Sequence, residues 1–94
     1  MTSELTFDWD DENLEHLARH DVTRADFEQV MANDPNLIRL PKHRWRRSLD
    51  WYGSTNGLRI LVVAFTIREG RIRAVTAFPA SKKRVQEFWK QKRH

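Results

Sequence analysis

Arginine and histidine are the side chains of this sequence whose types and spacing could do chemistry. Arg47, Arg59 and Arg73 each stand in a stretch with strand-like alternation, so each shares a predicted strand face with apolar side chains. A guanidinium on such a face is costly unless it is paired or opens onto a groove. The three arginines therefore either converge on one anionic site, or reach the sheet edge or pair with acidic residues of the N-terminal helices.

Two histidines, His16 and His20, are four residues apart and so lie on one face of a predicted helix. Two imidazoles make only half of a zinc site, and the sequence has no cysteine and no other histidine cluster to complete it. Alternatively, the pair lies on a polar face at the helix end, where the helix dipole favours a cation. In a third interpretation, His20 faces the sheet as a proton donor or acceptor. We expect no metal and no other cofactor.

Several other kinds of catalytic site have no counterpart in the sequence. The chain has no cysteine nucleophile, no Gly-x-Ser-x-Gly motif and no Gly-rich phosphate loop. The remaining arginine, lysine and histidine side chains suit the cleavage of RNA, in which the 2′-hydroxyl attacks its own phosphate. A protein then has only to position the strand, stabilise the added negative charge and transfer protons.

Charge is distributed unevenly along the chain. Residues 1–34 hold ten of the thirteen acidic residues and two basic ones, a net charge of about −8, whereas residues 35–94 carry about +12. Clustered lysines and arginines with interleaved aromatic residues are typical of nucleic-acid surfaces. Part of this charge could instead be paired internally, with the acidic helices lying against the basic sheet. The pattern therefore predicts either a surface for RNA or another polyanion, or internal ion pairs.

Two short helices are predicted near the N-terminus to position these side chains. A strand-like alternation over residues 5–9 ends at Asp10, which can cap a helix that runs to about residue 19. Thr23 begins a capping-box variant and predicts a second helix. The stretch "NDPN" (residues 33–36) ends that helix, because proline restricts the residue before it.

After residue 36 the hydrophobic period changes from that of helices to that of strands. Four strands are predicted over residues 37–40, 43–53, 58–68 and 72–80, with turn residues at "STNG" (54–57). Ser81 then caps a final helix with an apolar packing stripe. The sequence predicts an α+β fold in one domain over residues 1–94: a small antiparallel meander sheet with two N-terminal helices and one C-terminal helix.

The sequence also predicts where the protein works. It contains no apolar run long enough to cross a membrane, and its first residues are acidic where a signal peptide would be positive and then apolar. We therefore expect a cytoplasmic protein that does not associate with a membrane.

Three stretches carry a resemblance to a known family. "FDWDDENLEHLARHDV" (residues 7–22), "GLRILVVAFT" (57–66) and "GRIRAVTAFPASKKR" (70–84) resemble the BrnT-type toxins of bacterial type II toxin–antitoxin systems, which belong to the RelE-like ribonuclease superfamily. The corresponding positions are Trp9 and Asp10, Arg19 and His20, Gly57 with Arg59 nearby, and Arg71 with Arg73. The resemblance implies a RelE/BrnT-like fold and a metal-independent endoribonuclease that arrests translation and is silenced by a cognate antitoxin, often one with a DNA-binding domain.

The sequence departs from the family pattern in the last strand and the last helix. Where the family tends to read Ser-Ala-Arg-Arg-Ala, this chain has Thr76 to Ala80, so that Phe78 and Pro79 replace an arginine pair. Arg84 and Phe88 replace a glutamate and a tyrosine that are usual in the following helix. These departures favour an alternative function, a catalytically weak RNA- or partner-binding module of the same fold.

The leading hypothesis assigns roles to the basic side chains. We expect His20 to transfer protons, with His43 as a second choice, and the three strand arginines to stabilise charge on the phosphorane. RNA-binding contacts are expected from His43, Arg71, Lys82, Lys83 and Arg84. A cognate antitoxin is expected to cover the basic face with an acidic segment that carries apolar anchors. An antitoxin-like regulator is disfavoured, because no helix-turn-helix pattern is visible. The sequence predicts neither the RNA target nor the oligomeric state.

Overall fold

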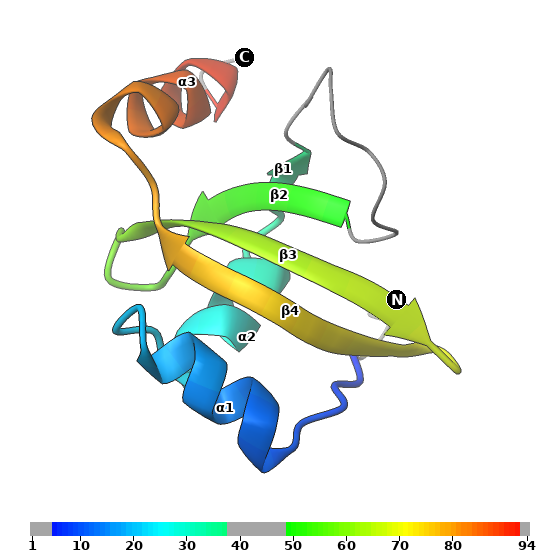
Figure 1. The fold of residues 1–94 in the computed structure, drawn as a ribbon. Coiled ribbons are helices and arrows are strands. Elements are labelled where there is room, and N and C mark those ends of the chain that lie inside the picture. Colours follow the sequence, from blue (N-terminus) through cyan, green and yellow to red (C-terminus); the bar gives the residue numbers. More distant parts are fainter. Residues whose placement is uncertain (1–4, 38–48, 93–94) are drawn as a thin grey trace.

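The computed structural model describes residues 5–37 and 49–92 of the chain. Within these ranges it has three helices and a four-stranded sheet (Figure 1). The helices are α1 (Asp11–Ala18), α2 (Arg24–Ala32) and α3 (Lys82–Lys92), and the strands are β1 (Asn36–Leu37), β2 (Leu49–Ser54), β3 (Ile60–Arg68) and β4 (Arg71–Pro79). The strands follow the order β1-β2-β3-β4, and every neighbouring pair is antiparallel. The predicted α+β class and meander sheet are confirmed.

The sheet separates two apolar clusters. On one face, α1 and α2 pack side chains such as Leu17 and Phe27 against Leu61 and Val63 of β3. On the other face, Phe88 of α3 packs against Tyr52 and Ile60. The three helices therefore form layers on both sides of the sheet, with α3 apart from α1 and α2 (Figure 1). Successive residues of β3 belong alternately to the two clusters, because successive side chains of a strand point to opposite faces.

The first two helices begin where the sequence predicts. Asp10 Oδ1 accepts a 2.8 Å hydrogen bond from the Asn13 amide, and the Asn13 side chain accepts one from the Asp10 amide. Thr23 and Asp26 make the same reciprocal pair at the start of α2, with both distances at 3.1 Å. Each capping box satisfies amide groups that have no partner inside the helix. Both predicted caps are confirmed.

The N-terminal stretch was expected to be a strand over residues 5–9, and this expectation is wrong. Only Phe7 pairs with the sheet, through an isolated parallel bridge to Ile72. Ile72 donates to the Thr6 carbonyl at 2.8 Å and accepts from the Asp8 amide at 2.9 Å. The chain leaves the edge of β4 at once, because Asp10 already caps α1. Few residues remain for a longer ladder.

The middle of the chain is described only in part. Of the strand expected over 37–40, only Leu37 is described, and it belongs to β1; the strand expected over 43–53 is described from Leu49 onward, as β2. His43 and Arg47, two of the predicted site residues, lie outside the described residues. At Gly53 the sheet approaches α2 so closely that an added Cβ would lie 2.9 Å from Val30 Cγ1. Glycine at this position therefore lets α2 pack on β2.

A β-bulge changes which residues of β4 share a face. Ala77 lies opposite Val63 and Ala74 lies opposite Phe65, although Ala74 and Ala77 are three positions apart on β4 and Val63 and Phe65 only two positions apart on β3. The irregularity at Ala64/Phe65 adds one residue to β4 and reverses the alternation beyond it. Arg73 was expected to share a face with Ala77, and this is wrong. Both Ala74 and Ala77 belong to the core, and Arg73 lies between core residues.

Candidate functional site

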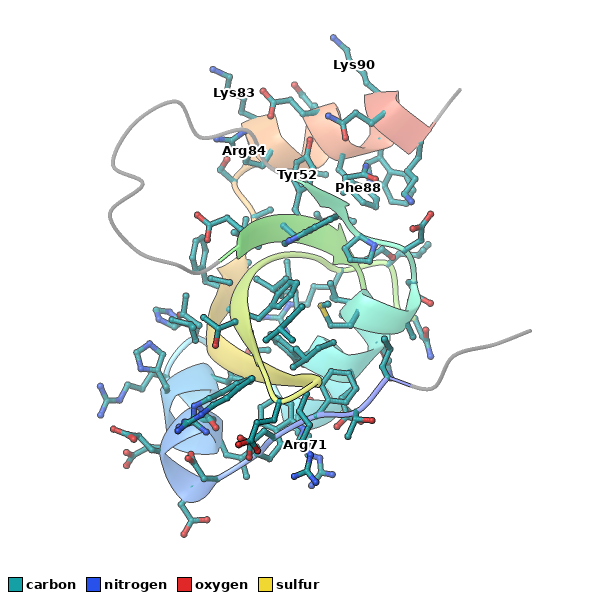
Figure 2. The ribbon with its side chains drawn as sticks, turned by 90° about the vertical axis from the view of Figure 1, so that its right-hand side faces the viewer. Tyr52, Arg71, Lys83, Arg84, Phe88 and Lys90 are labelled. Atoms are coloured by element: carbon teal, nitrogen blue, oxygen red, sulfur yellow. The ribbon has the colours of Figure 1, made fainter. Side chains whose placement is uncertain are left out.

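The predicted site residues lie at two opposite ends of the sheet. Arg71 begins β4 beside the β3–β4 turn, whereas Lys82, Lys83 and Arg84 begin α3, just after β4 ends at Pro79. Eight residue steps at about 3.3 Å place these ends roughly 26 Å apart. Figure 2 shows Arg71 pointing away from the sheet at the end farthest from Lys83. Arg71 and the cations of α3 therefore belong to separate surfaces.

Arg73 is engaged by two carboxylates of the N-terminal segment. Its Nη2 donates a 2.9 Å hydrogen bond to Asp10 Oδ2, and its Nη1 lies 3.6 Å from Asp8 Oδ2. The Asn13 amide and then the Arg73 guanidinium hold the pKa of Asp10 below its ordinary value. The hydrogen bond to Asp10 in turn raises the pKa of Arg73, which keeps its charge. For Arg73, the structure therefore shows pairing with acidic residues, which was the alternative to convergence on one anionic site.

Arg59 stands just before β3 and contacts the loop between α1 and α2. Its Nη1 donates a 2.8 Å hydrogen bond to the Asp21 carbonyl and lies 3.6 Å from Asp26 Oδ2. Asp21 adopts a left-handed backbone conformation, φ 60°, in the loop between α1 and α2. Asparagine and aspartate enter this region more readily than most residues. Arg59 therefore joins the start of β3 to this loop.

Arg59 and Arg73 do not converge on one site. Arg59 immediately precedes β3, while Arg73 lies opposite Thr66 near its far end. Seven residue steps along an extended strand correspond to roughly 23 Å. Of the alternatives left open by the sequence, convergence on one site does not apply to Arg59 and Arg73, because the antiparallel register places them at opposite ends of the hairpin. The third arginine, Arg47, is outside the described residues.

His20 lies at the same end of the sheet as Arg59. Its ring centroid is 6.0 Å from that of Phe78, near the end of β4, with an interplanar angle of 60°. The centroid of the His16 ring is 6.1 Å from that of the His20 ring. Among residues 5–37 and 49–92, no group of three histidine, cysteine or acidic side chains could hold a metal ion. His20 thus contacts the edge of the sheet, as the third interpretation expected, and is exposed just beyond the end of α1, as the second expected.

The start of α3 adds cations to this end. Ser81 Oγ accepts a 3.3 Å hydrogen bond from the Arg84 amide, so the predicted cap is confirmed. Lys82 and Lys83 are exposed, and Figure 2 shows Lys83 pointing away from the sheet. The Arg84 guanidinium donates to Glu87 Oε1 at 2.9 Å, which offsets part of its charge. Lys82 and Lys83 are the stronger candidates for phosphate contacts.

We call this end of the sheet the His20 corner, and it is defined by six residues from three parts of the chain. They are His20, Arg59, Phe78, Lys82, Lys83 and Arg84. The Ala80 amide donates to the Ile60 carbonyl at 3.0 Å and so ties the segment between β4 and α3 to the start of β3. The imidazole and the exposed aromatic ring are in contact, whereas the three cations of α3 belong to the helix on the other face of the sheet from α1.

Two aromatic residues near the site were missed by sequence reasoning. Phe78 is 38% exposed, and the only sequence signal for it was an aromatic residue directly before proline. Tyr52 is only 2% exposed and meets the Phe88 ring edge-on beneath α3 (Figure 2). Burial, and then the negative charge of Glu87, raise the pKa of Tyr52, while Arg84 opposes the shift. Tyr52 is therefore a core residue whose hydroxyl stays protonated at neutral pH.

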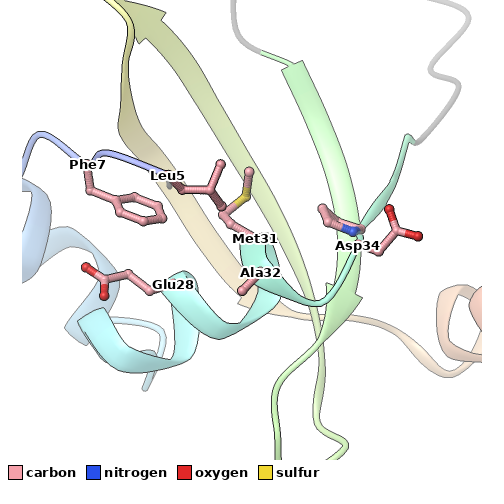
Figure 3. Close-up of a pocket in the computed structure, with 7 residues that line it drawn as sticks. Leu5, Phe7, Glu28, Met31, Ala32 and Asp34 are labelled. Carbon is pink, nitrogen blue, oxygen red and sulfur yellow. The ribbon is translucent and has the colours of Figure 1, made fainter. Parts of the chain in front are cut away.

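An open groove of about 620 Å³ lies elsewhere, between the N-terminal segment and α2 (Figure 3). Its lining is mostly apolar and comprises Leu5, Phe7, Glu28, Met31, Ala32, Asp34 and Pro35. The Glu28 carboxylate in it already accepts hydrogen bonds from Trp9 Nε1 at 2.8 Å and Arg24 Nε at 3.1 Å. None of the predicted site residues that the structure describes lines this groove.

No protein-family model and no curated protein matches this chain. The resemblance to BrnT-type toxins therefore rests on the short motifs of the sequence. No helix among the described residues is both long and apolar enough to cross a membrane.

Proposed function

We propose that this protein is a metal-independent endoribonuclease of the toxin type, which acts on RNA in the bacterial cytoplasm. The observation that carries the proposal is the His20 corner, where an imidazole, a guanidinium and the cations of α3 lie at one end of the sheet. RNA carries its own nucleophile, the 2′-hydroxyl. Side chains that move protons and stabilise negative charge are sufficient for its cleavage.

Four residues of the corner have a role in this proposal. His20 transfers protons to or from the reacting oxygens, and Arg59 stabilises the charge that develops on the phosphate. Within residues 5–37 and 49–92, the Arg59 guanidinium contacts Asp21 and Asp26 through Nη1, and a guanidinium has five N–H donors. Lys82 and Lys83 bind flanking phosphates. In this proposal Arg73 mainly stabilises the fold, because its guanidinium already pairs with Asp8 and Asp10.

A second candidate is a catalytically weak RNA- or partner-binding module. The observation that favours it is that Arg59 and Arg73 are both engaged within the chain. An arginine held by carboxylates stabilises a transition state less well, because the added negative charge must compete with an existing partner. In either case, a cognate antitoxin would bind the cations of α3 through an acidic segment with apolar anchors.

Cleavage of RNA in excess EDTA distinguishes these functions. The ribonuclease should cut unstructured RNA under these conditions and leave a 2′,3′-cyclic phosphate or a 3′-phosphate. RNA binding without cleavage would favour the binding module. Cleavage that stops on chelation would contradict the metal-independent mechanism, and neither binding nor cleavage would contradict both candidates.

A further inference from the structure

We propose that Phe78 is a base-stacking residue that holds one unpaired base of single-stranded RNA beside His20. This inference rests on the proposed function, because it names the form of RNA that the His20 corner accepts. The stacked base would place its own ribose and phosphate next to the imidazole. The neighbouring phosphates would then follow the chain toward Lys82 and Lys83.

The first observation is the exposure of the Phe78 ring. Phe78 lies opposite Val62 in the β3–β4 ladder, on the face away from the core that α1 and α2 cover. The helix on that face, α3, begins at Lys82 and packs Phe88 on Tyr52 and Ile60. Phe78 therefore stays 38% exposed, while its neighbour Ala77 is fully buried. A large aromatic ring in contact with water is an available platform for another flat ring.

The second observation is the contact with His20. The two rings meet at 60° with centroids 6.0 Å apart, so they form an angle rather than a parallel stack. The contact fixes one side of Phe78 and leaves its exposed part for a base. A base stacked there has its sugar close to the imidazole, which is where a proton-transfer group must lie in RNA cleavage.

The third observation is the charge around the ring. No acidic residue stands between Gly70 and Gln86, a stretch that includes Phe78 and the three cations at the start of α3. Aromatic rings beside a basic surface are the usual combination for single-stranded nucleic acid, because bases stack while phosphates pair with the cations. Such stacking tolerates every base, since each base has an aromatic face.

The competing occupant is an acidic protein segment with an apolar anchor. Such a segment needs a contiguous apolar patch, because the centre of a protein interface is apolar and well packed. Phe78 instead has the His20 imidazole against its ring, and the basic first turn of α3 begins four residues after it in the chain. The observations therefore favour RNA.

The test uses oligouridylate with 2′-O-methyl groups, which lacks the nucleophile and so binds without being cleaved. A matched oligomer has the same backbone but no bases in its middle section. Wild-type protein should bind the complete oligomer roughly 5- to 100-fold more tightly than the abasic one, because each stacked base contributes about 1–3 kcal/mol. This comparison needs no substitution and so does not depend on the folding of a variant.

Substitutions then locate the stacking contact. Phe78→Leu should lose the preference for the base-bearing oligomer, whereas Phe78→Trp should keep it. Ile67→Ala is the control, because Ile67 is also exposed, at 63%, but lies at the other end of the hairpin. Thermal unfolding of each variant shows whether the fold is retained.

The outcomes separate this inference from the proposed function. Equal binding of both oligomers, or an unchanged preference in Phe78→Leu, would overturn the stacking role of Phe78. If the wild type nevertheless cleaved unmodified RNA, the proposed ribonuclease function would still stand. A protein that neither binds nor cleaves RNA would overturn both. Binding of an acidic peptide that depends on Phe78, without any base preference for RNA, would assign the ring to a protein partner instead.

Discussion

Arg73 Nη2 donates a 2.9 Å hydrogen bond to Asp10 Oδ2, and this bond joins β4 to the residue that caps α1. Arg59 and Lys92 make comparable contacts with Asp26 and Asp34. The acidic N-terminal part of the chain is thus held to the basic C-terminal part by ion pairs. Part of the charge asymmetry stabilises the fold, and Lys82 and Lys83 remain exposed.

Arg73→Ala should lower the melting temperature by a few degrees, because it releases both Asp8 and Asp10 from β4. Cleavage, measured well below that temperature, should fall less than the roughly 100-fold expected for the loss of a transition-state donor. Arg73→Lys is the matched control, since it keeps the charge and loses the planar geometry. If a stably folded Arg73→Ala variant lost 100-fold or more of the cleavage rate, Arg73 would have a catalytic role.

The lowered pKa of Asp10 predicts a loss of stability in acid. A carboxyl whose pKa is lower in the folded state contributes stability above its unfolded pKa, and that contribution disappears as the pH falls through the folded value. The free energy of unfolding should therefore decrease below about pH 4 in the wild type. Asp10→Asn should show a smaller decrease, since asparagine still caps α1 but does not titrate. Urea unfolding at a series of pH values measures this difference, and parallel curves for the two proteins would contradict it.

His20→Ala should reduce cleavage by roughly 100- to 10,000-fold if the imidazole transfers protons. A proton-transfer histidine also makes the rate depend on pH, and the variant should lose that part of the pH dependence. His16→Ala provides the control, because His16 is an exposed histidine of α1, four residues before His20, and was assigned no role. If the pH dependence survives in His20→Ala, another group performs the transfer.

Replacing Lys82 and Lys83 with glutamine should weaken RNA binding to a similar extent for every sequence. Each lost phosphate contact should lower the slope of log K against log salt by about 0.7 for a single strand. The variant should be at least as stable as the wild type, because cations in the first turn oppose the helix dipole. Lys90→Gln is the control on the same helix, and Figure 2 shows Lys90 pointing away near its other end. An unchanged slope in the double variant would leave these lysines as solubilising surface.

Local chemistry in the sequence was enough to predict the elements of the fold. Asp10, Thr23 and Ser81 cap helices where expected, because each cap is a hydrogen bond between residues three apart in the chain. The change of hydrophobic period after residue 36 likewise predicted a meander sheet, which the structure confirms. These features depend on neighbours in sequence, so the sequence alone determined them.

The partners of the functional side chains depend on tertiary structure. The bulge at Ala64/Phe65 moved Arg73 out of the face that simple alternation predicts, and the register placed Arg59 at the far end of β3. The meeting of His20 with Phe78 joins residues 58 positions apart in the chain. No local preference encodes such a contact, because it depends on how the loop after α1 packs against the edge of the sheet. The sequence by itself determined which elements form and which side chains are available for chemistry, and only the packing of those elements decided which side chains lie together.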